Sequence, residues 1–98
     1  MTFTAMTKTI AKMIVQDNAY ATERRYIKGD ADLTEYDEEC VDLYSRQIRH
    51  LLMNSDGCKW NYVLNGIKII AGRDFHLGFK AQDKIINVCK EYGIVFTL

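Results

Sequence analysis

Apolar residues recur at intervals of three and four along the first part of the chain, a spacing typical of the buried stripe of an amphipathic helix. The stripe consists of Phe3, Met6, Ile10, Met13 and Ile14. We predict a first helix from about Thr4 to Lys28, capped by Thr2 or Thr4, and leave open a break near Asp17 where the stripe is interrupted.

A second helix is predicted to begin at the capping segment 32–35 and to run to about Asn54. Asp32 followed three residues later by Glu35 resembles a capping box. The apolar positions expected to face inward are Tyr36, Cys40, Leu43, Tyr44, Ile48, Leu51 and Leu52. Because only a few residues separate the two helices, we expect them to pack as an antiparallel pair.

Residues 59–71 indicate a tight β-hairpin. Two apolar runs flank Asn65-Gly66, the pair that best tolerates the two positive φ angles of a type I′ turn. On the first strand Trp60, Tyr62 and Leu64 would share one face. Whether Trp60 and Tyr62 are buried in a core or exposed is left open.

After the hairpin, a loop over 72–79 leads to a third helix from about Lys80 to Tyr92. Gly93 suits a left-handed C-terminal cap, and Ile94 to Leu98 indicates a terminal strand. The element order is then α-α-β-β-α-β in one α+β domain, residues 1–98. We expect a three-stranded mixed sheet with strand order 2-1-3, covered on one face by the helices.

Charge is unevenly distributed although the formal net charge is zero. Residues 30–42 contain seven acidic side chains and no basic one. Some of these carboxylates would stabilise the positive end of the second helix. Asp42 could also pair with Arg46 one turn later. The remaining carboxylates have no evident structural role and predict a negative surface that suits a basic partner.

Three cysteines, Cys40, Cys58 and Cys89, form no close pair, so we expect reduced thiols and a cytoplasmic protein. No apolar run is long enough to span a membrane, and the first residues do not resemble a signal peptide. The cysteines and histidines show no metal-binding spacing, and the glycines form no nucleotide-binding loop. We therefore expect no metal and no cofactor.

Two further sites are weighed as alternatives. The hairpin 59–71 together with Arg24, Arg25 and Lys28 could form a nucleic-acid-binding surface, although the acidic block would repel phosphate. A small enzyme could use the loop residues Arg73, Asp74 and His76, with His76 as acid or base, but no nucleophile motif lies nearby.

The hypothesis favoured by these observations is a non-enzymatic protein-binding module. It would be a small inhibitor or modulator of a larger protein with a basic surface, such as a nucleic-acid-processing enzyme. Phage proteins that block host defences offer an analogy in size and charge. The residues predicted to bind the partner are Tyr26, Asp30, Asp32, Glu35, Tyr36, Glu38, Glu39 and Asp42. Homo-oligomers remain an open alternative.

Overall fold

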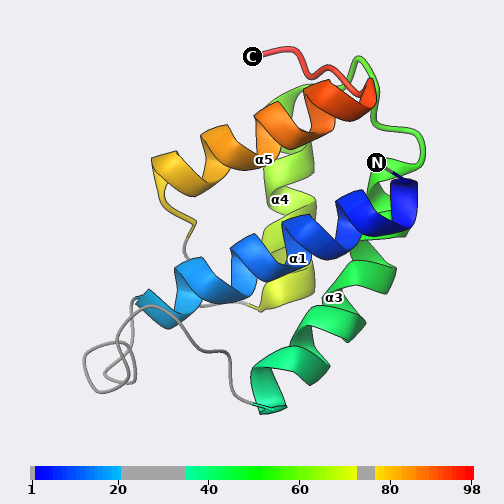
Figure 1. Ribbon diagram of the computed structural model, residues 1–98. Coiled ribbons are helices and arrows are strands. Elements are labelled where there is room, and N and C mark those ends of the chain that lie inside the picture. The colour runs from blue at the N-terminus through cyan, green and yellow to red at the C-terminus, as the bar shows by residue number, and fades with distance from the viewer. Residues whose placement is uncertain (1, 21–34, 73–76) are drawn as a thin grey trace.

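The computed structural model describes residues 2–20, 35–72 and 77–98, without the side chains of residues 18–20 and 35–37. Four helices occupy this part of the chain (Figure 1). They are α1 (Phe3–Tyr20), α3 (Glu35–Leu52), α4 (Trp60–Ala71) and α5 (Phe79–Tyr92).

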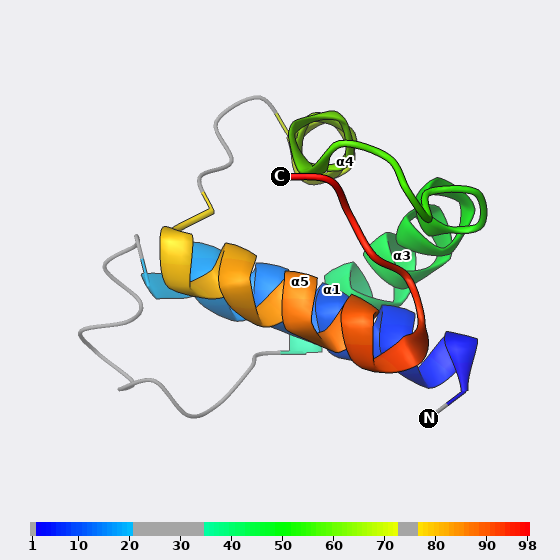
Figure 2. The same cartoon turned by 90° about the horizontal axis from the view of Figure 1, so that it is seen from above.

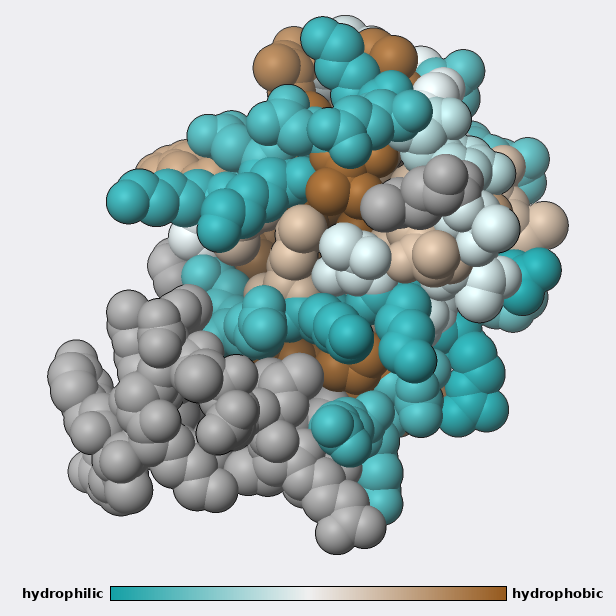
Figure 3. All heavy atoms as spheres, viewed as in Figure 1, coloured by the Kyte–Doolittle hydropathy of each residue, from teal (hydrophilic) through white to brown (hydrophobic). Residues whose placement is uncertain are grey.

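The helices form two antiparallel pairs. Figure 2 shows α1 and α5 lying lengthwise beside each other, with α4 viewed along its axis. The second pair, α3 and α4, runs across the first, and α1 packs against both α3 and α5. Hydrophilic side chains form rows over the face in Figure 3, with apolar residues visible between them. The largest fully buried side chains include Met6, Ile10, Ile14, Ile48, Leu52, Ile67 and Ile85.

The predictions for the first, second and third helices are confirmed within the described residues. The α1 helix is continuous to Tyr20, and the remainder of its predicted range lies outside the described residues. Its first turn is capped by Thr2, whose Oγ1 accepts a hydrogen bond from the Ala5 N–H at 3.1 Å. At the end of α5, Gly93 is left-handed with φ 117°, and the Ile94 N–H donates to the Cys89 carbonyl at 2.8 Å.

Asp17 does not break α1. Its Oδ2 accepts a hydrogen bond from the Gly78 N–H at 2.9 Å, immediately before α5 begins. A carboxylate at this position satisfies an N–H group at the start of α5 and faces the positive end of the helix dipole. The residue that interrupts the apolar stripe of one helix therefore caps its neighbour.

The β-hairpin predicted over 59–71 was wrong, because Trp60–Ala71 is the helix α4. The same residues also fit a helical stripe, with Trp60, Val63 and Ile67 at i, i+3 and i+7 and all three buried. An isolated hairpin needs a further strand or a packing surface to be stable. A helix satisfies its own backbone hydrogen bonds, and this one buries its stripe against the core.

Gly66 supports a close contact between helices rather than a turn. Its φ angle is not positive, and a Cβ placed on it would lie 2.7 Å from Cδ1 and 2.9 Å from Cδ2 of Leu51 in α3. The absence of a side chain therefore lets α4 approach α3 closely. Gly66 therefore has a packing role, although the Asn65-Gly66 pair is typical of a turn in the sequence.

The predicted sheet was also wrong, because the described residues contain no strand. The C-terminal segment 94–98 is extended, but it forms only an isolated parallel bridge between Thr97 and Lys59. Backbone hydrogen bonds join it to the turn after α3, from Gly57 N–H to the Val95 carbonyl at 2.8 Å and from Thr97 N–H to the Cys58 carbonyl at 2.9 Å. The part of the chain that the structure describes is therefore all-α, not α+β with strand order 2-1-3.

Trp60 and Tyr62 have opposite environments. Trp60 is buried, its ring lies 5.4 Å from that of Phe96 between centroids, and its Nε1 donates to Gln82 Oε1 at 3.0 Å. Tyr62 is exposed on the outer side of α4. Residues two apart lie on different faces of a helix, so the shared strand face predicted for them does not exist.

Candidate protein-binding face on α3

The inner side of α3 is held by α1 and α4. Val41, Ile48 and Leu52 are buried in the core, and Leu51 contacts Gly66 of α4. Ser45 Oγ and Thr7 Oγ1 of α1 form a hydrogen bond of 3.3 Å across the helix pair. These contacts fix which side of α3 faces outward.

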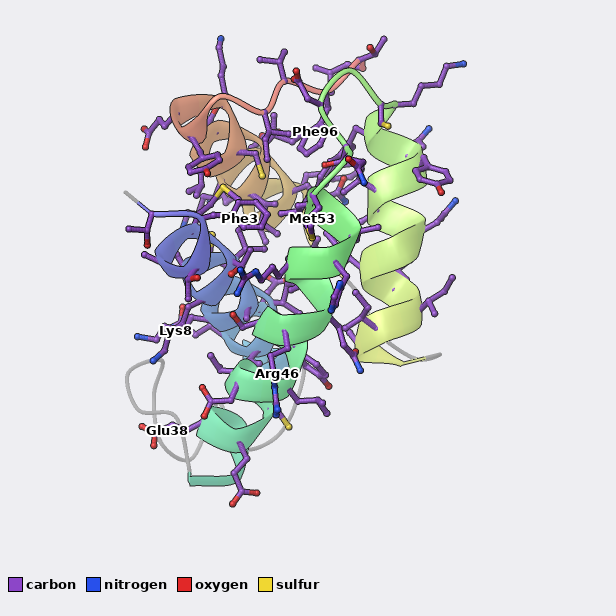
Figure 4. The ribbon with its side chains drawn as sticks, turned by 90° about the vertical axis from the view of Figure 1, so that its right-hand side faces the viewer. Phe3, Lys8, Glu38, Arg46, Met53 and Phe96 are labelled. Atoms are coloured by element: carbon purple, nitrogen blue, oxygen red, sulfur yellow. The ribbon has the colours of Figure 1, made fainter. Side chains whose placement is uncertain are left out.

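The outer side of α3 carries acidic residues in its first half and basic residues in its second half. Glu38, Glu39 and Asp42 are exposed, and so are Arg46 and Arg49. Figure 4 looks onto this helix and shows Glu38 near its start and Arg46 farther along. Both groups match the helix dipole, since carboxylates stabilise the N-terminal end and cations the C-terminal end.

No ion pair joins these charged side chains to one another or to other residues in the described structure. The ion pair expected between Asp42 and Arg46 does not form in the described structure. Arg46 Nε instead donates to the main-chain oxygen of Asp42 at 3.4 Å. The carboxylates of Glu38, Glu39 and Asp42 therefore face solvent. We call the face carrying these three carboxylates and Leu43 the acidic face of α3.

The structure positions three of the eight predicted partner-binding residues in full. Glu38, Glu39 and Asp42 lie together on α3 and are exposed. Glu35 and Tyr36 belong to the first turn of α3, with side chains outside the described part. Tyr26, Asp30 and Asp32 lie outside the described residues.

Leu43 was assigned to the wrong side of the helix. It was predicted to face inward, but it is 45% exposed and lies beside Asp42. Val41, absent from the predicted stripe, is buried instead. Counting back from Ile48 by seven residues gives Val41, so helical spacing alone could have identified the buried position. The acidic face thus includes an exposed leucine that the sequence reasoning missed.

A groove of about 350 Å³ opens at one end of the bundle, where α1 begins and α3 and α5 end. Its lining residues are Phe3, Leu52, Met53, Asp56, Tyr92 and Ile94. The rings of Phe3 and Tyr92 are 5.5 Å apart between centroids. Asp56 Oδ1 accepts a hydrogen bond from the Val95 N–H at 2.9 Å, which gives this carboxylate a structural role. The groove offers mainly apolar contact.

The two alternative sites lie partly or wholly outside the described part of the chain. Arg24, Arg25 and Lys28 lie outside the described residues, as do Arg73, Asp74 and His76. The hairpin proposed to bind nucleic acid is a helix, and the Trp60 ring is buried, so it does not offer a base-stacking surface.

Cysteine and metal chemistry add no further site in the described residues. Cys89 is buried, and burial raises the pKa of its thiol to about 11, which disfavours the reactive thiolate. Cys40 and Cys58 are half-buried and unpaired. Where the structure describes the chain, no three His, Cys, Asp or Glu side chains gather into a group that could hold a metal ion.

Comparison of the chain with protein-family models, with curated proteins and with solved structures finds no match. None of the described helices combines the length and the apolar character needed to cross a bilayer.

Proposed function

We propose that this protein is a non-enzymatic, cytoplasmic protein-binding module that engages a basic surface of a larger partner through the acidic face of α3. The observation that supports this function is a group of exposed carboxylates that form no ion pair with the described residues, beside the exposed Leu43 on a helix fixed by the core. Charged groups of this kind steer a partner of opposite charge and set its orientation.

Binding by this face needs no movement of the fold. Thr7–Ser45 and Leu51–Gly66 hold α3 from two sides, so its outer residues are already arranged before a partner arrives. Preorganisation lowers the entropic cost of association. A small rigid body that covers a basic surface can act as an inhibitor or modulator of its partner without any chemistry of its own.

Leu43 would supply the apolar contact within the charged surroundings. Interfaces commonly bury an apolar centre within a polar rim. The partly exposed Leu43, which lies next to carboxylates, fits that arrangement. The same arrangement makes the interaction sensitive to ionic strength, because exposed charges are screened at high salt.

The function is tested by capture from a lysate of the source organism with two matched baits. One bait carries Glu39→Lys and Asp42→Lys, and the control carries Asp83→Lys and Glu91→Lys, two exposed acidic residues of α5. Both variants change the net charge by the same amount. We expect the α3 variant to recover at least about tenfold less of a basic partner than the wild type, because like charges across an interface cost several kcal/mol.

The control should recover the partner as the wild type does, with quantitative mass spectrometry as the readout. Circular dichroism should show that both variants remain helical. Equal recovery by the α3 variant and the control would refute the acidic face as the binding surface.

A further inference from the structure

The outer side of α3 has a regular ridge that no other described element covers. Its residues are Glu39, Leu43, Arg46 and His50, all exposed, at spacings of four, three and four. This is the spacing with which one helix packs along another in a coiled coil. We call these residues the α3 ridge. Asp42 and Arg49 flank it.

Charge along this side reverses from one half of the helix to the other. Glu39 and Asp42 make the first half acidic, while Arg46 and Arg49 make the second half basic. A second copy of the same helix in antiparallel orientation would bring each acidic half against a basic half. A parallel copy would instead oppose like charges.

We propose that the α3 ridge pairs with the α3 ridge of a second copy of this chain in an antiparallel, two-fold symmetric dimer. This inference rests on the proposed protein-binding role of the same helix and names a second copy as an occupant of its face. Its basis is the self-complementary charge pattern of exposed side chains that have no ion pair within the described chain.

The register follows from the helix geometry. With the two-fold axis between residues 44 and 45, Glu39 lies level with His50 of the second copy, and Asp42 lies between Arg46 and Arg49 of the second copy. The two Leu43 side chains lie on opposite sides of the two-fold axis, displaced from each other by about 4.5 Å along the helix direction at a rise of about 1.5 Å per residue. Each contact occurs twice because the interface is isologous.

The size of the interface predicts a weak dimer. The 18 residues of α3 span about 27 Å. A strip along one helix of this length buries less surface than a standard stable interface, which buries about 800 Å² per partner. Charge pairs at exposed positions contribute modestly and are screened by salt. A larger basic partner would displace the second copy of such a weak dimer, because it binds the same acidic half of α3.

Sedimentation velocity with charge-swapped variants tests the pairing. The acidic-half variant carries Glu39→Lys and Asp42→Lys, and the basic-half variant carries Arg46→Glu and Arg49→Glu. We expect the wild type to self-associate, each variant alone to be monomeric, and an equimolar mixture of the two variants to recover a dimer. The dissociation constant of the wild type should rise at least about tenfold between about 0.1 M and about 1 M NaCl, as the Debye length falls from about 10 Å to about 3 Å.

Asp83→Lys with Glu91→Lys again serves as the control and should dimerise as the wild type does. A mixture that stays monomeric, or single variants that self-associate like the wild type, would overturn the pairing. The proposed function is tested independently of the dimer. If neither variant nor wild type dimerises, but only the acidic-half variant loses a captured basic partner, then the self-pairing is wrong and the partner-binding role stands.

Discussion

Cys89 shows how burial sets the chemistry of a single residue. It lies on the inner side of α5 with none of its surface exposed, and burial raises the pKa of its thiol from 9.0 to about 11. The direction of the pKa shift follows because the charged thiolate is disfavoured where water is excluded.

The stability of the protein should therefore fall between about pH 9 and about pH 11. In this range the thiol of the unfolded chain ionises while the buried thiol keeps its proton, so the unfolded state is favoured as pH rises. Cys89→Ala removes this contribution. Urea unfolding at several pH values should show a steeper loss for the wild type than for the variant, and parallel losses would contradict the shift.

At Gly66 the sequence pattern led to the wrong prediction of a turn. The sequence places it after Asn65, where a turn is expected, but the approach of Leu51 comes from a helix some 15 residues away. Local sequence does not report such a contact. A glycine can serve a positive φ or a close approach, and only the neighbouring helix distinguishes the two.

At the scale of elements, α4 replaces the predicted hairpin. Val63, Ile67, Ile69 and Ile70 favour strands by propensity, and tertiary packing overrides that preference. By contrast, α1, α3 and α5 have long apolar stripes with capping residues, and these helices were predictable within the described residues. The acidic residues of the candidate site were also predictable from the charge run, whereas Leu43 required the correct orientation of α3.

Two isoleucines of α4 provide a direct test of the helix. Ile67 is 1% exposed and Ile69 is 82% exposed, whereas in a strand residues two apart would share one face. Ile67→Ala should lower the free energy of unfolding by about 2–5 kcal/mol because it leaves a cavity in the core. Ile69→Ala should change it by less than about 0.5 kcal/mol. Urea denaturation of both variants measures the difference, and similar losses would argue against α4.

At the scale of the whole molecule, the C-terminal segment ties the helices together. Ile94 and Phe96 point into the core, while the backbone of Val95 and Thr97 bonds to the turn that joins α3 to α4. The segment thus links the end of α5 to the start of α4. The terminal strand predicted for this segment was wrong, because within the described residues the segment bonds to a turn and forms only an isolated bridge.

Phe96 should matter more to global stability than any other residue of this segment. Phe96→Ala should cost about 3–5 kcal/mol, since the ring is buried against Trp60. Leu98→Ala is the matched control, because Leu98 is 91% exposed and should be nearly neutral. Thermal unfolding followed by Trp60 fluorescence separates the two outcomes, and a Phe96 variant as stable as the control would show that the segment does not anchor the fold.

By itself, the sequence determined three of the described helices and the acidic start of α3, because each depends on residues close together in the chain. The tertiary structure alone decided that 60–71 is a helix packed against α3 and that the C-terminal segment joins a turn. These features depend on contacts between distant residues, such as Leu51 with Gly66 and Phe96 with Trp60. The local propensity of a segment does not indicate which distant part of the chain the segment will pack against.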